Sequence, residues 1–147
     1  MTTPASDPHD LQRFLAAQAD CYDQALAELR AGRKRSHWMW FIFPQVAGLG
    51  SSRTAQFYAI GSRSEAETCL AHPLLGQRLR ECAAALLAID GRTAEQIMGY
   101  PDDLKLQSSM TLFGAIAETG NPFAAVLEKY YAGEQCARTT EFLGQMR

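Results

Sequence analysis

Residues 33–45, RKRSHWMWFIFPQ, decide the fold, because the same letters suit either a β-strand or a short buried helix. Tryptophan, phenylalanine and isoleucine favour strands, yet the only candidate partner strand is QFYAI at 56–60. Pro44 disfavours the α conformation at Phe43 and would end a helix there. We therefore predict a short helix, capped by Ser36 and packed into the centre of the domain.

Helical spacing of apolar residues extends over most of the remaining chain. Such residues recur every three or four positions within 10–31, 73–89 and 123–131. The stretch 102–117 is apolar on most sides, which is typical of a buried central helix. We predict an all-α fold, a compact multihelical single domain of about six helices with a buried central helix pair.

Polar residues that can cap helix starts precede several of these patterns. Ser64 and Thr93 each have a Glu or Gln three positions later, which is the spacing of a capping box. Pro73 and Pro101 stand where the first turn of a helix tolerates proline best. The remaining expected caps are Asn121 and Thr139.

Composition and charge exclude several classes of protein. The 147 residues suit one helical domain at 10–147, preceded by a flexible N-terminal arm at 1–9. A net charge of −2 makes nucleic acid an unexpected partner. No signal peptide and no membrane-spanning apolar run is present, so we expect a cytoplasmic protein without membrane contact. The four cysteines lack metal-binding spacing, and we expect neither metal nor cofactor.

The opening stretch carries the first candidate binding residues. Trp38 or Trp40 can stack on a planar ligand, with its phosphate groups at the preceding cations. Gln45 can read ligand edges through its amide, and the glycines of GLGSS at 48–52 allow close backbone approach. The alternative is that these aromatic side chains only fill the core.

The second candidate region is DDLKLQSSMTLF at 102–113. Lys105 and Ser109 share one face of a mostly apolar helix, so they need polar partners or a cavity. Asp103 and His37 are the candidate catalytic groups, and an internal hydrogen-bond network is the alternative. The candidate ligand-binding residues are Arg33, Lys34, Ser36, His37, Trp38, Trp40, Gln45, Gly50, Ser52, Lys105 and Ser109.

Several motifs carry a resemblance to a known family. GRKRSHWMWFIFPQVAGLGSS, FYAI, EAETCLAHPLLGQRL and DDLKLQSSMTLF together resemble bacterial domain-of-unknown-function family 1810, whose members often carry the label "calpastatin". The resemblance runs from Asp10 to Leu143. It implies a compact multihelical domain without an established activity. A likeness of general architecture alone also connects the chain to helical proteins that handle NAD-derived ADP-ribose.

Two functional classes stay open. The first is a site for a nucleotide-like or ADP-ribose-like phosphorylated ligand, between residues 33–52 and the helix of Lys105. An enzyme there would be a metal-independent hydrolase or transferase. The second is a non-catalytic interaction module, whose exposed aromatic and basic patch docks a protein or a second copy to form a homodimer.

Overall fold

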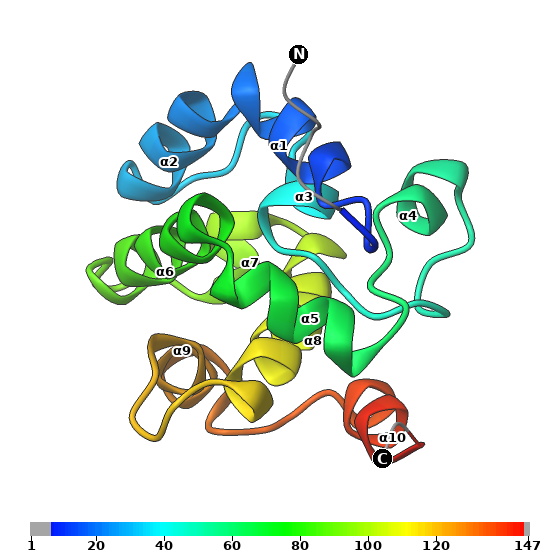
Figure 1. Ribbon diagram of the computed structural model, residues 1–147. Helices are drawn as coiled ribbons and strands as arrows, with labels where there is room; N and C mark the ends of the chain where they lie inside the picture. Colours follow the sequence, from blue (N-terminus) through cyan, green and yellow to red (C-terminus); the bar gives the residue numbers. More distant parts are fainter. Residues whose placement is uncertain (1–6, 146–147) are drawn as a thin grey trace.

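The computed structural model describes residues 7–145, which form ten α-helices and no β-strand (Figure 1). The predicted all-α fold is confirmed, with more helices than expected because several have only four or five residues. The helices are α1 (Gln12–Ala19), α2 (Tyr22–Arg30), α3 (Met39–Ile42), α4 (Arg53–Phe57), α5 (Arg63–Ala71), α6 (Pro73–Leu87), α7 (Ala94–Met98), α8 (Asp102–Ile116), α9 (Pro122–Tyr131) and α10 (Ala137–Gln145).

Helix α8 lies at the centre of the domain. Leu106 and every residue from Ser108 to Phe113 are buried, which accounts for the lack of a polar face in this stretch. Helix α9 packs on α8, and its Phe123 ring lies 6.0 Å from the Phe113 ring, but its Glu128 and Lys129 are exposed, so only α8 has the burial expected of a central helix. Helices α5, α7 and α10 also pack on α8. Figure 1 shows α2 and α9 on opposite sides of α6.

The first expected helix is two helices. Helix α1 ends before Asp20, and Cys21 has a non-helical φ of −125° before α2 begins. Near the break, Gln18 is buried and its Nε2 donates to the Phe41 carbonyl at 2.7 Å. Helix α1 consequently packs on α3, while α2 packs on α6. The spacing of apolar residues did not reveal the break, because both helices bury apolar residues in the same core.

The opening stretch contains helix α3, so the prediction of a short buried helix is confirmed. It ends at Phe43, whose φ of −124° and ψ of 77° lie outside the α region beside Pro44, as the steric argument requires. The predicted Ser36 cap is wrong, because the helix begins after Trp38 without a side-chain cap. The segment 56–60, the candidate partner for a strand, contributes only an isolated parallel bridge between Val46 and Ile60.

The other caps divide into confirmed and wrong predictions. Ser64 is not a cap, because α5 begins two residues earlier, where the Ser62 hydroxyl accepts the backbone N–H three residues on. Thr139 lies inside α10, where its buried hydroxyl is 2.8 Å from that of Ser108. The proline at the start of α6 is confirmed. The confirmed caps are the capping box at Thr93 and the cap at Asn121.

The beginning of the described chain is attached to the domain. Residues 1–6 of the expected N-terminal arm lie outside the described residues, but the Asp7 carboxylate accepts the backbone N–H groups of Leu11 and Gln12 at 2.8 and 2.9 Å. Asp7 therefore satisfies two of the free donors at the start of α1. Among the helices described here, none has the length and apolar character needed to cross a membrane.

Candidate functional site

A cavity of about 270 Å³ lies where the loop of residues 45–52 meets α4 and the start of α8. The half-buried Trp40 of α3 and Lys105 of α8 form part of its wall. We call it the Trp40–Lys105 cavity. Its other lining residues are Gln45, Val46, Leu49, Gly50, Ser51, Ser52, Ala55, Tyr58 and Ala59.

The Lys105 ammonium is held over the Trp40 indole. Its nitrogen lies 5.3 Å from the ring centroid, within the range of a cation–π interaction. The Asp102 carboxylate is 3.5 Å from this ammonium, whereas it lies 2.9 Å from the ammonium of Lys34. Lys105 is thus the more loosely paired lysine, and it lines a cavity in which a ligand anion can reach it.

Several polar groups around the cavity have no hydrogen-bond partner among residues 7–145. They are the indole N–H of Trp40, the side-chain amide of Gln45 and the hydroxyls of Ser51 and Tyr58. None of these groups is fully buried, since Ser51 is exposed and the other three residues are half-buried, so solvent can pair each of them. Here they converge on a cavity, where water or a ligand can pair them.

Tyr58 is a candidate site residue that the sequence analysis missed. The sequence FYAI was interpreted as part of a candidate strand and as a family motif, but its tyrosine lies just after α4 and lines the cavity. The ring packs against Phe41 and Phe14, at centroid distances of 5.4 and 5.9 Å. No local pattern marks this role, because it depends on how the loop after α4 folds back over α1 and α3.

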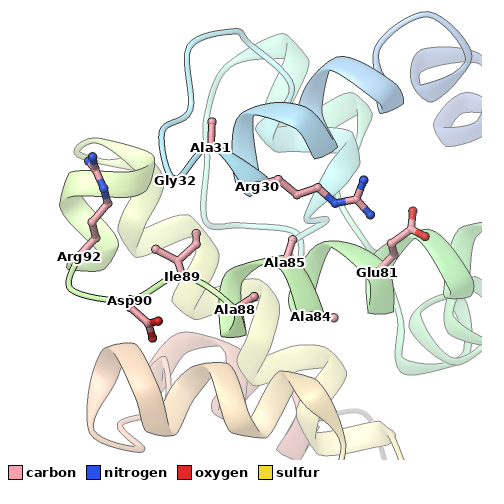
Figure 2. A pocket seen from close by; sticks show the side chains of 10 residues that line it. All are labelled: Arg30, Ala31, Gly32, Glu81, Ala84, Ala85, Ala88, Ile89, Asp90 and Arg92. Atoms are coloured by element: carbon pink, nitrogen blue, oxygen red, sulfur yellow. The ribbon is translucent and has the colours of Figure 1, made fainter.

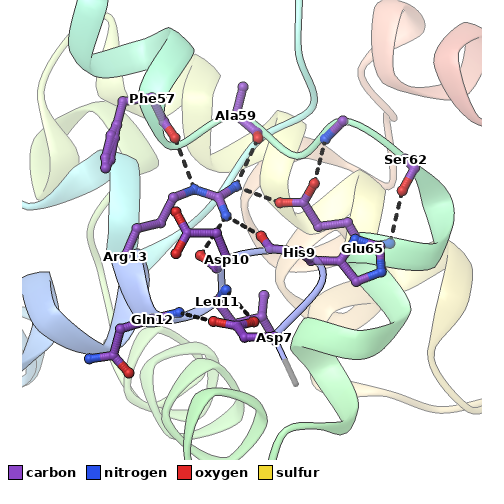
Figure 3. A network of polar contacts seen from close by, with 11 residues as sticks. Asp7, His9, Asp10, Leu11, Gln12, Arg13, Phe57, Ala59, Ser62 and Glu65 are labelled. Atoms are coloured by element: carbon purple, nitrogen blue, oxygen red, sulfur yellow. Dashed lines mark hydrogen bonds and ion pairs between the residues drawn. The ribbon is translucent and has the colours of Figure 1, made fainter. Parts of the chain in front are cut away.

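Arg13 fixes the loop that carries Tyr58 (Figure 3). Its guanidinium donates to the carbonyl oxygens of Phe57 at 2.9 Å and Ala59 at 3.1 Å, on either side of the tyrosine. The same group forms an ion pair with Glu65 of α5. One side chain of α1 therefore ties the cavity wall to two helices.

Trp38 and Ser36 do not line the cavity but donate hydrogen bonds to the buried carboxylate of Glu28. This carboxylate accepts the Trp38 indole N–H at 2.9 Å, the hydroxyl and backbone N–H of Ser36, the backbone N–H of Arg35 and the amide of Gln24. Burial alone would raise the pKa of Glu28. The hydrogen bonds, led by those of Ser36 and Arg35, outweigh burial and lower the pKa to about 2. Of the two tryptophans, only Trp40 can stack on a ligand, because Trp38 is 1% exposed.

The cations and the histidine of the opening stretch lie outside the cavity lining. Lys34 donates to the Ser36 carbonyl at 2.6 Å and lies 5.0 Å from the Trp38 ring centroid. Arg33 lines a separate surface hollow, and His37 is exposed. An interaction module built on this stretch would present cations and His37, because Trp38 and its neighbour Met39 are buried.

The polar residues of α8 divide between the cavity and the interior. Ser109 lies one turn after Lys105, is fully buried, and its hydroxyl has no partner among the described residues. The Oδ1 atom of Asp103 is likewise buried and unpaired within residues 7–145, and its backbone carbonyl accepts the Tyr131 hydroxyl. The structure thus brings together five candidates and leaves both catalytic candidates outside the cavity lining. The five are Trp40, Gln45, Gly50, Ser52 and Lys105.

A larger hollow of about 540 Å³ lies between the end of α2 and α6 (Figure 2). Four alanines and Ile89 line it together with the charged residues Arg30, Arg92, Glu81 and Asp90. It has no aromatic side chain to stack on a ligand, and its charges of both signs balance. We therefore place the candidate site at the smaller Trp40–Lys105 cavity. Within residues 7–145, no group of His, Cys, Asp or Glu side chains could hold a metal ion.

Comparisons with known proteins identify a family and a similar solved structure, and neither names an activity. The family described as "Protein of unknown function (DUF1810)" matches residues 8–143. Among solved structures, the crystal structure of the conserved hypothetical protein Rv1873 from Mycobacterium tuberculosis is similar, with a TM-score of 0.92 and 53% sequence identity. The match covers 94% of this chain and 99% of that one. No curated protein matches the chain.

Proposed function

The chain belongs to the DUF1810 family of unknown function, as its motifs predicted, and we propose that it binds a small nucleotide-like phosphorylated ligand in the Trp40–Lys105 cavity. Neither the family nor the similar crystal structure supplies an activity, so the proposal rests on the site. The observation that carries it is the Lys105 ammonium, 5.3 Å from an indole ring that lines a cavity.

This arrangement suits the two parts of a nucleotide. A half-buried indole offers a π face, and stacking of a base on an aromatic side chain contributes about 1–3 kcal/mol. A lysine ammonium is a compact partner for a phosphate oxygen. The unpaired amide of Gln45 can donate to and accept from the edge of a base. Cation, ring and amide therefore supply three different contacts within one cavity.

Size favours a mononucleotide. Typical ligand pockets hold roughly 300–1,000 Å³, and this cavity holds about 270 Å³. A nucleobase with its nearest phosphate matches that space better than a whole ADP-ribose, of which only one end would be enclosed. We propose binding and no catalytic step, since Asp103 and His37 do not line the cavity.

We also propose a cytoplasmic location. The four cysteine thiols, Cys21, Cys69, Cys82 and Cys136, are free in the structure. Disulfides are rare in the reducing cytosol and common in secreted domains, so unpaired thiols support this location. Burial raises the pKa of Cys69 and Cys82 to about 12, which keeps both thiols protonated and unreactive.

Tryptophan fluorescence tests the binding proposal, because the chain has two tryptophans and only Trp40 lines the cavity. We expect nucleoside monophosphates to quench the emission saturably, and Trp40→Phe to abolish the change. Lys105→Met should weaken binding by roughly tenfold or more, because a hydrogen bond to a charged group is lost. Arg35→Met is the matched control, since it removes an exposed cation of the same chain outside the cavity. Absence of quenching with all four bases would overturn the proposal.

A further inference from the structure

Asp102 lies between two lysines beside the Trp40–Lys105 cavity. One carboxylate oxygen is 2.9 Å from the Lys34 ammonium, and the other is 3.5 Å from the Lys105 ammonium. Two lysine charges and one aspartate charge leave a local charge of +1. The Asp102 carboxylate thus offsets one of the two lysine charges beside the cavity.

Only one of the two lysines is available to a ligand. The Lys34 side chain is 8% exposed, and its ammonium is already bound to Asp102 and to the Ser36 carbonyl. The Lys105 side chain is 30% exposed, lines the cavity and has the longer ion pair. A first negative charge on the ligand therefore finds a cation. A second charge would lose water in the cavity without gaining a cation of its own, and the Asp102 carboxylate would repel it.

We propose that Asp102 makes this site prefer ligands with a single negative charge at the phosphate, which is the charge of a phosphodiester. A terminal phosphate monoester carries about −1.5 to −2 at pH 7, whereas each phosphodiester carries one charge. The inference rests on the proposed nucleotide site and names its substrate class. The ligand is a nucleotide whose phosphate is esterified on both sides.

A matched pair of probes tests this selectivity, namely adenosine 5′-monophosphate and its phosphate methyl ester. They share base and ribose and differ by one charge once the monoester is fully ionised, above about pH 7. We expect the wild-type protein to bind the methyl ester at least about threefold more tightly by calorimetry. Asp102→Asn should raise the affinity of the monoester relative to the methyl ester by about fivefold, because removing a negative charge favours the doubly charged ligand more.

Two further variants separate charge from structure. Asp102→Glu keeps the charge and should retain the wild-type ratio, whereas Asp23→Asn removes an exposed charge from α2 and should not change it. The ratio of the affinities for the two probes is measured on each variant by itself. A smaller folded fraction lowers both affinities equally and leaves this ratio unchanged. If Asp102→Asn does not fold, the preference of the wild-type protein for the methyl ester over the monoester still tests the inference. Binding of neither probe would overturn the proposed site together with the inference. Equal affinities in the wild type, or an unchanged ratio in Asp102→Asn, would overturn the inference alone.

Discussion

The buried carboxylate of Glu28 provides a prediction whose size follows from the structure. Replacing Glu28 by Gln keeps the shape of the side chain and removes its charge, so the variant resembles the protonated wild type. The pKa of this carboxyl is lowered from 4.5 to about 2 in the folded protein. Each pKa unit corresponds to about 1.4 kcal/mol. The lost charge should therefore cost about 3 kcal/mol in the free energy of unfolding at neutral pH.

The direction of the pH dependence follows from the same shift. Because the folded pKa is the lower one, the unfolded chain binds more protons, and the contribution of Glu28 to stability is present above pH 4.5. It is lost as the pH falls from 4.5 towards 2. The difference between wild type and Glu28→Gln should therefore shrink to about 1.5 kcal/mol near pH 3.

Urea unfolding followed by circular dichroism measures both values. Glu141→Gln is a suitable control, since this exposed glutamate of α10 should change stability by less than about 0.5 kcal/mol. A cost of Glu28→Gln below about 1 kcal/mol at neutral pH would refute the reasoning. So would a difference that does not decrease with acidification.

Four other substitutions test core packing, a close backbone approach and an ion pair by the same unfolding measurement. Phe41→Ala should cost about 3–5 kcal/mol, because the ring is 8% exposed within the core; a cost near zero would place the ring outside the core. Gly76→Ala should cost about 3 kcal/mol or more, because its Cβ would lie 2.0 Å from the Leu70 carbonyl oxygen. Gly144→Ala, with open space around it, should instead be neutral or stabilising by up to about 1 kcal/mol, and equal effects at both glycines would contradict the close approach. Lys34→Met should cost about 1–3 kcal/mol, because the lost ammonium leaves a carboxylate without its closer cation.

The helical fold could be predicted because most elements carry a local signal. The capping box at Thr93 and the cap at Asn121 act within a few residues of themselves, so the sequence contains the whole interaction. The prediction of a cap at Ser64 was wrong because Ser62 caps the helix two residues earlier. The break between α1 and α2 also escaped prediction, since the contact of Gln18 with Phe41 spans 23 residues.

The candidate site could be located in part. Lys105 was identified because a cation in a mostly apolar helix needs a partner, and the structure places it over Trp40. The sequence could not separate Trp40 from Trp38, which have similar neighbours. The difference is that Glu28, ten residues away on α2, accepts the N–H of Trp38. A contact of this kind depends on how α2 packs beside the opening stretch, and no periodicity encodes it.

The two indole N–H signals of a ¹H–¹⁵N correlation spectrum test the binding claim most directly. The Trp38 N–H is bonded to Glu28, whereas the Trp40 N–H has no partner among residues 7–145. Trp40→Phe assigns the two signals. On titration with adenosine 5′-monophosphate or its methyl ester, we expect the Trp40 signal to shift saturably while the Trp38 signal stays in place. Two unmoved indole signals, with backbone shifts at the hollow between α2 and α6 instead, would contradict a nucleotide site at the Trp40–Lys105 cavity.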